Sequence, residues 1–184
     1  HLAIMDKYDP KHRVGLIVDE WGTWYQVEPG TNPGFLYQQN TMRDAVVAAM
    51  TLNIFNKHSD RVRMANIAQL VNVLQSVVLT DGEEMLLTPT YHVFDMFKGH
   101  QGGTCLKTLI SDNGDFRSSI SVSASEKDGV MTLTLANVSC NEDAQVDLSL
   151  LGLDREIVSA EGRLLAADDI HAHNTFEAPE AVTV

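Results

Sequence analysis

The hydrophobic pattern of the first hundred residues follows the order strand, helix, strand, helix. Residues 14–18, VGLIV, are apolar without alternation, which is typical of a strand buried on both faces of a parallel sheet. A loop rich in Gly, Pro, Asn and aromatic residues then occupies 22–40. Apolar positions at helical spacing, with Thr41 and Asp44 resembling a capping box, predict a helix over 41–58.

A second strand and a second helix complete this half of the chain. We predict a strand over 61–69 that continues through 70–79, and a helix over 88–100 with Pro89 in its first turn. This order is typical of a barrel or a doubly wound sheet. Two strands cannot close a barrel, so this half reads as an incomplete domain whose apolar strands need a cover: another copy, the second half or a rearranged helix.

Beyond a Gly-rich stretch at 99–104, the pattern changes to alternation of polar and apolar residues. Asp128 and Gly129 separate two alternating runs at 118–139, which predicts a hairpin with a type I′ turn. Similar runs at 144–152 and 156–167 predict further strands, so we expect an antiparallel sandwich or jelly roll. The predicted domains are residues 1–100 and residues 101–184.

Composition narrows the classes of partner. The 184 residues carry a net charge of −12, and no cluster of Lys or Arg offsets it, so we expect no binding to nucleic acid. No apolar run approaches the roughly 20 residues that span a bilayer, and no secretory signal is visible, so we expect no membrane association. The two cysteines, Cys105 and Cys140, lack metal-ligand spacing, and reduced thiols are favoured over a single disulfide.

Two adjacent carboxylates, Asp19 and Glu20, follow the first strand directly. The carboxyl ends of parallel strands carry the active sites of α/β folds, where a fixed carboxylate can act as nucleophile, base or metal ligand. The alternative is an ordinary strand end in solvent. Aromatic residues crowd this strand end and its loop, which suits stacking against sugar rings, although loop packing explains part of them: Trp21, Trp24, Tyr25, Phe35 and Tyr37.

Amide side chains mark the end of the second strand. Asn66, Gln69 and Asn72 can both donate and accept hydrogen bonds, which fits a neutral hydroxylated ligand. The alternative is that they satisfy backbone groups of the loop. The histidines show no metal-ligand spacing, so we interpret them as surface or core residues and expect no metal site.

The stretch GLIVDEWGTWY, together with KHSDRVRMANIAQLVNVLQ, resembles the α-L-arabinofuranosidases of glycoside hydrolase family 51. The resemblance covers essentially the whole chain. It implies an α+β chain made of the last βα units of a (β/α)₈ TIM barrel followed by a C-terminal, jelly-roll-like antiparallel β-sandwich.

The resemblance also implies roles for three residues. Glu20 would be the nucleophile of a retaining mechanism, Trp24 would line the sugar site, and Gln69 would bind hydroxyl groups of arabinose. The family's acid/base Glu lies on an earlier barrel strand, and no matching block occurs in this chain. The family needs no metal or cofactor, and its members are commonly intracellular and oligomeric.

We therefore expect the C-terminal portion of a cytoplasmic retaining glycosidase that releases terminal α-L-arabinofuranosyl residues from arabinan- or arabinoxylan-type oligosaccharides. This portion carries the nucleophile without the acid/base, and alone it should be inactive. The full-length protein is expected to form a homo-oligomer. The alternative is a non-catalytic carbohydrate-binding or assembly module built on the sandwich.

Overall fold

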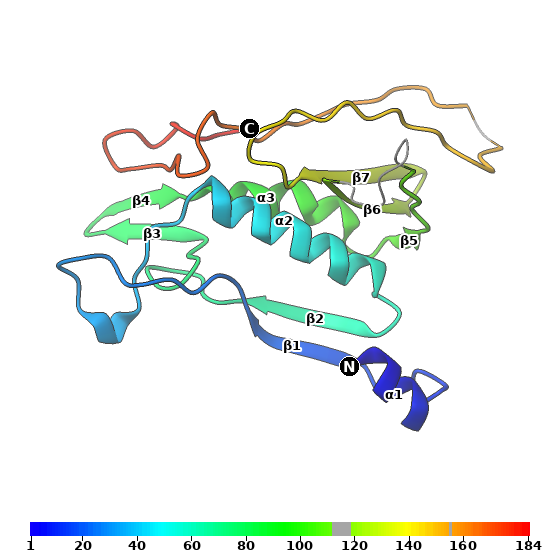
Figure 1. The fold of residues 1–184 in the computed structure, drawn as a ribbon. Helices are drawn as coiled ribbons and strands as arrows, with labels where there is room; N and C mark the ends of the chain where they lie inside the picture. The colour runs from blue at the N-terminus through cyan, green and yellow to red at the C-terminus, as the bar shows by residue number, and fades with distance from the viewer. Residues whose placement is uncertain (112–118, 155) are drawn as a thin grey trace.

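A computed structural model describes residues 1–111, 119–154 and 156–184 (Figure 1). Its helices and strands, in chain order, are α1 (Leu2–Tyr8), β1 (Leu16–Trp21), η1 (Pro33–Phe35), α2 (Met42–Lys57), β2 (Val62–Ile67), β3 (Val78–Asp81), β4 (Glu84–Leu87), α3 (Pro89–Phe97), η2 (Lys98–His100), β5 (Thr104–Leu106), β6 (Ile120–Lys127) and β7 (Val130–Asn137). In Figure 1, α2 lies between the β1–β2 pair and the sheet of β5, β6 and β7.

The parallel pair predicted for the first half is present. β1 and β2 run parallel, with Leu16 opposite Val62 and Trp21 opposite Ile67, and α2 is the crossover between them. Among the described residues the expected cover is incomplete, because Ile17 of β1 and Met64 of β2 are each 49% exposed. The described helices and the described part of the second half leave these two positions half exposed.

Both predicted helices form where the pattern places them. At the start of α2, the backbone N–H of Thr41 donates to Asp44 Oδ2 at 2.8 Å, which is the reciprocal half of the capping box. In α3, Pro89 occupies the first turn, where its missing N–H costs no helical hydrogen bond. The ends of α2 agree with the predicted range within one residue.

The predicted continuation of the second strand through residues 70–79 is wrong. β2 ends at Ile67, and the chain turns back into an antiparallel hairpin of β3 and β4. Gly82 has a φ of 56° at the first central position of the turn, a conformation that favours glycine. The apolar run misled the prediction because Leu74, Val77 and Leu79 are buried within a loop and a hairpin, where they mimic one continuous buried strand.

In the second half the central hairpin is confirmed. β6 and β7 are antiparallel, and Asp128 and Gly129 have φ values of 52° and 82°, as a type I′ turn requires. The predicted strands at 144–152 and 156–167 are not strands among the residues that the structure describes. A strand needs a paired neighbour for its backbone groups, and these segments have none in the described chain. The described residues of this half thus contain one three-stranded sheet, β5–β6–β7, and the second sheet of the expected sandwich remains a prediction.

The alternating hairpin turns its polar face to α2. Asn53 of α2, fully buried, accepts hydrogen bonds from Ser123 Oγ and Thr134 Oγ1, both at 2.7 Å, and donates to Ser121 Oγ at 3.2 Å. His100 adds contacts from its ring to Ser125 and Thr134, and burial lowers its pKa. The two predicted halves thus share a buried polar layer, while the boundary between them remains a prediction.

An apolar cluster lies beside that layer. It joins α2, α3, β7 and the C-terminal tail through small and medium side chains, which are Met42, Ala45, Ala48, Ala49, Val93, Ala136 and Val182. The small alanines let α2 approach its neighbours closely, so one helix contacts elements from both halves.

Arg61 fastens the N-terminal helix to the start of β2. Its guanidinium is 1% exposed and contacts Asp6 at 2.6 Å and Asp9 at 2.9 Å. The hydrogen bond from the Val14 backbone N–H, and then Arg61, lower the pKa of Asp9. A hydrogen bond from Arg61 likewise lowers the pKa of Asp6.

The lowered pKa of Asp9 predicts acid-sensitive anchoring of the N-terminus. A carboxylate whose folded pKa is depressed stabilises the fold above its unfolded pKa, near 3.8, and that stability is lost as pH falls through the folded value. Asp9→Asn should therefore flatten the fall of the free energy of unfolding below about pH 4, measured by urea titration across pH. The exposed control Asp168→Asn should keep the wild-type slope. Identical slopes for Asp9→Asn and wild type would contradict this account.

Candidate functional site

The two carboxylates of the predicted site lie near the C-terminal end of strand β1. Asp19 and Glu20 are both exposed, and no described residue forms a hydrogen bond or ion pair with the Glu20 carboxylate. A register shift between Val18 and Trp21 interrupts the regular alternation of side chains. Alternation alone therefore does not place Asp19 on the face opposite Glu20. Glu20 is therefore an exposed carboxylate at the carboxyl end of a parallel strand.

The two tryptophans after these carboxylates differ in environment. Trp21 packs edge-on against Phe55 of α2, with ring centroids 5.4 Å apart, and stacks on Phe94 of α3 at 6.1 Å. Trp24 is 68% exposed. Trp21 is thus a packing residue, and Trp24 has a free ring surface near the strand end.

Gln69 follows β2 directly, so it lies at the strand end next to that of Glu20. The Ala68 backbone N–H donates to the Trp21 carbonyl at 2.8 Å, which joins the two ends, and the peptide between Ala68 and Gln69 is cis. The Gln69 side chain is exposed. Asn72 instead follows the alternative interpretation, because its amide bonds to the backbone N–H and C=O of Thr80 at 2.8 and 3.0 Å.

A buried glutamine that the sequence did not single out holds the two loops together. Gln75 Oε1 accepts the backbone N–H of Thr23 at 2.7 Å, and its Nε2 donates to the Asp44 carbonyl at 2.8 Å. Thr23 in turn donates to the Asp44 carboxylate. Gly22 has a φ of 145°, and a Cβ there would lie 3.0 Å from Gln75 Oε1, so glycine permits this approach. An amide within the mostly apolar run at 70–79 is the signal that would have found this network.

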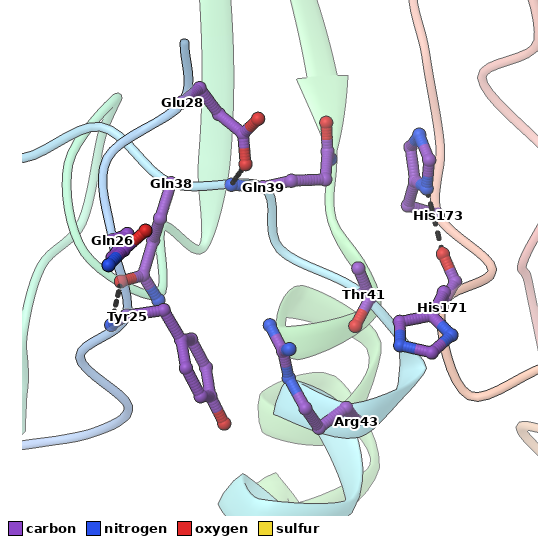
Figure 2. Close-up of a pocket in the computed structure, with 9 residues that line it drawn as sticks. All are labelled: Tyr25, Gln26, Glu28, Gln38, Gln39, Thr41, Arg43, His171 and His173. Carbon is purple, nitrogen blue, oxygen red and sulfur yellow. Dashed lines mark hydrogen bonds between the residues drawn. The ribbon is translucent and has the colours of Figure 1, made fainter.

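A cavity of about 320 Å³ opens between the loop at 22–40, the start of α2 and the C-terminal tail (Figure 2). Arg43 lies over the ring of Tyr25, 3.6 Å from its centroid. His171 and His173 of the C-terminal tail line the opposite side of the cavity. The tail is held against the start of α2 because the backbone N–H groups of Met42 and Arg43 donate to tail carbonyls at 2.9 Å. Glu20, Trp24 and Gln69 do not line this cavity.

Two findings concern metal-binding groups and membrane-spanning helices in the described part of the chain. Within 1–111, 119–154 and 156–184, no group of three or more His, Cys, Asp or Glu side chains is placed to hold a metal ion. Across the same ranges, no helix has both the length and the apolar character to cross a bilayer. Cys105 and Cys140 are free thiols, and both are exposed.

Comparison with known proteins decides the family. A family model described as the α-L-arabinofuranosidase C-terminal domain matches residues 19–184. The chain belongs to this family. The resemblance to the arabinofuranosidases of family 51, drawn from two short blocks of sequence, is therefore confirmed.

Individual relatives agree. The chain is 46% identical to an intracellular exo-alpha-L-arabinofuranosidase from Bacteroides ovatus, across 99% of this chain and 36% of the relative. It is 30% identical to an intracellular exo-alpha-(1->5)-L-arabinofuranosidase 1 from Bacillus subtilis, across 89% of this chain and 36% of the relative. The structure matches the crystal structure of the GH51 arabinofuranosidase from Xanthomonas axonopodis pv. citri with a TM-score of 0.85 and 46% identity, covering 99% of this chain and 38% of that one. The chain thus spans little more than a third of these relatives.

The role of Gln75 as the link between the loops predicts a stability cost. Gln75→Ala leaves the buried Thr23 N–H without a partner, which costs about 1–3 kcal/mol. It also removes the side-chain bond to the Asp44 carbonyl, which keeps its acceptor role within α2. We expect a lower urea midpoint with an unchanged slope. Gln69→Ala, which truncates an exposed glutamine on the same loop, is the matched control and should change the free energy of unfolding by less than about 0.5 kcal/mol. Equal effects of the two variants would refute the proposed link.

Proposed function

We propose that this chain is the C-terminal portion of a retaining glycoside hydrolase that releases terminal α-L-arabinofuranosyl residues from arabinan- or arabinoxylan-type oligosaccharides. Glu20 is its nucleophile. The observation that carries the proposal is the open Glu20 carboxylate at the end of parallel strand β1, beside Gln69 at the end of β2, in a member of the arabinofuranosidase family.

The proposed chemistry uses a strand carboxylate with which no described residue pairs. Glu20 attacks the anomeric carbon of the terminal arabinofuranosyl unit, and the glycosidic C–O bond breaks as a covalent glycosyl-enzyme forms. A second carboxylic acid protonates the leaving oxygen and then, as carboxylate, activates the water that hydrolyses the intermediate. Retaining enzymes hold the two carboxyl groups about 5–5.5 Å apart. We place this acid outside the 184-residue chain.

Trp24 and Gln69 position the sugar in this proposal. The exposed ring of Trp24 offers a flat apolar surface to the C–H face of the furanose, and the free Gln69 amide can donate to and accept from its hydroxyl groups. Gln75 acts one step behind them, because it fixes the loop that carries Trp24 against the loop that carries Gln69. No group in this scheme needs a metal or cofactor.

We assign β1 and β2 to the last two strands of a (β/α)₈ barrel, and β5–β7 with the chain that follows to a β-sandwich. The exposure of Ile17 and Met64 supports the barrel, because further parallel strands would cover that face. We also propose that the full-length protein is a cytoplasmic homo-oligomer. The word intracellular in the names of the Bacteroides and Bacillus relatives supports the location.

The non-catalytic sugar-binding module built on the sandwich has less support. Residues 101–184 contain two phenylalanines, Phe116 and Phe176, and no tryptophan or tyrosine on which sugar rings could stack. Strong binding of arabino-oligosaccharides that survives deletion of residues 1–100 would favour this module instead.

The missing acid/base predicts that the 184-residue chain does not hydrolyse an aryl α-L-arabinofuranoside. Loss of general acid–base catalysis alone typically costs about 10²–10⁴-fold, and loss of the remaining barrel removes most of the pocket. Release of the aryl group is followed by absorbance. Clear turnover by the chain that Glu20→Gln abolishes would show that the chain holds a complete active site. This result would refute the proposal that it is only a portion of the enzyme.

A second assay tests Glu20 itself, in the longer protein that this proposal requires. Glu20→Ala should lower kcat by more than about 10³-fold, because only binding and electrostatic catalysis remain. Added azide should restore part of the rate on an aryl arabinofuranoside and give an arabinosyl azide of inverted configuration, because the small anion occupies the place of the carboxylate. Asp168→Asn, an exposed acid in the tail, is the control and should keep wild-type activity. Wild-type rates in Glu20→Ala would refute the role.

A further inference from the structure

We propose that a second cavity, distinct from the Glu20 site, binds a neutral sugar ring of the same oligosaccharide. This inference rests on the proposed function. The cavity has a volume of about 340 Å³ and lies between the turn η1, strand β3 and the C-terminal tail. Its lining combines three aromatic rings, Phe35, Tyr37 and Phe176, with the polar side chains of β3 and its neighbouring loops.

One wall is an aromatic platform on a fixed turn. Phe35 is 69% exposed at the end of η1, although an exposed phenyl ring gains nothing from packing. The turn is held by Asn32 Oδ1, which accepts the Gly34 N–H at 3.0 Å, and the base of the loop is closed by the Glu28 N–H donating to the Tyr37 carbonyl at 2.9 Å. A rigid, exposed aromatic ring loses little entropy when a ligand stacks on it.

The tail that supplies Phe176 is anchored as well. Asn174, which is buried, donates from Nδ2 to the Leu87 carbonyl of β4 and to the Val182 carbonyl, each at 2.9 Å. Its Oδ1 accepts the Val182 N–H at 2.7 Å. Hydrogen bonds within the tail and to β4 therefore hold the segment that places Phe176 beside β3.

The opposite wall decides the class of ligand. Asn72 and Thr80 bond to each other and so are occupied. Asp81, at the end of β3, is exposed, and no described residue pairs with it. It is the one charged residue among the described residues that line the cavity, so the lining disfavours an anionic ligand. Burial and the charge of Glu28 raise the pKa of Tyr37, which keeps its phenol protonated as a donor at neutral pH.

A carbohydrate ring matches these groups. Its C–H face can lie on Phe35, its hydroxyl hydrogens can donate to Asp81, and its hydroxyl oxygens can accept from Tyr37. The cavity also has the right position, because η1 lies in the loop after β1 and β3 lies in the chain after β2. Both therefore extend from the strand ends that carry Glu20 and Gln69. Neither of these residues lines it, nor does Trp24, so it is a subsite for a sugar unit beyond the one at Glu20.

The test is an NMR titration of the ¹⁵N-labelled 184-residue chain with linear arabinotriose. We expect the backbone amides of residues 31–37 and 79–81 to shift together. Phe35→Ala should raise Kd about tenfold, equivalent to about 1.4 kcal/mol, and the isosteric Asp81→Asn should also weaken binding. Tyr8→Ala, which removes an aromatic residue of similar exposure (77%) from α1, is the matched control and should leave Kd unchanged.

Other outcomes separate this subsite from the Glu20 site. If Trp24→Ala abolishes binding while Phe35→Ala does not alter it, the subsite is wrong and the Glu20 proposal stands. If Phe35→Ala abolishes binding but azide rescue at Glu20 fails, the subsite stands and the assigned nucleophile is wrong. Absence of shifts at 31–37 and 79–81 with arabinotriose, or stronger shifts there with 1,3-diaminopropane than with the sugar, would overturn the inference.

Discussion

The requirement that every buried polar group find a hydrogen-bond partner decides how this chain packs. α2 buries Asp44 in its first turn and Asn53 in its second half, and neither tolerates an apolar neighbour in place of a donor or acceptor. Asn53 therefore fixes α2 on the hydroxyl-bearing face of β6 and β7. Asp44 fixes the same helix to the loop that leaves β1. One helix thus connects both halves through polar contacts as well as apolar packing.

This polar framework supports the candidate site. Gln75 reaches from the loop after β2 to Thr23 in the loop after β1, while Asn40 donates to the Ser76 carbonyl at 3.1 Å and Thr90 Oγ1 at 2.9 Å. The strand ends that carry Glu20 and Gln69 are thereby braced from behind, and their own side chains stay free. Free functional groups on a rigid, hydrogen-bonded frame are what a binding or catalytic site requires.

The sequence was most informative where local chemistry governs. The capping box at Thr41, proline in the first turn of α3 and the Asp128–Gly129 turn each act over a few residues, and each is found as predicted. Prediction failed over 70–79, where a buried loop and hairpin have the same apolar composition as a strand. It also failed at 144–152 and 156–167, because alternation marks a surface suited to a sheet but does not supply a neighbouring strand.

By itself the sequence determined the strand that carries Asp19 and Glu20, the helices α2 and α3, and the family, since these depend on contiguous residues. Tertiary structure alone decided which aromatic residues pack and which stay open, separating Trp21 from Trp24. It also decided that the polar face of the β6–β7 hairpin is buried. In the same way, only the tertiary structure shows that Gln75 holds the loop of Thr23, which is far from it in sequence. The physical reason is that burial and hydrogen-bond pairing depend on neighbours distant along the chain, and a local pattern carries no record of those neighbours.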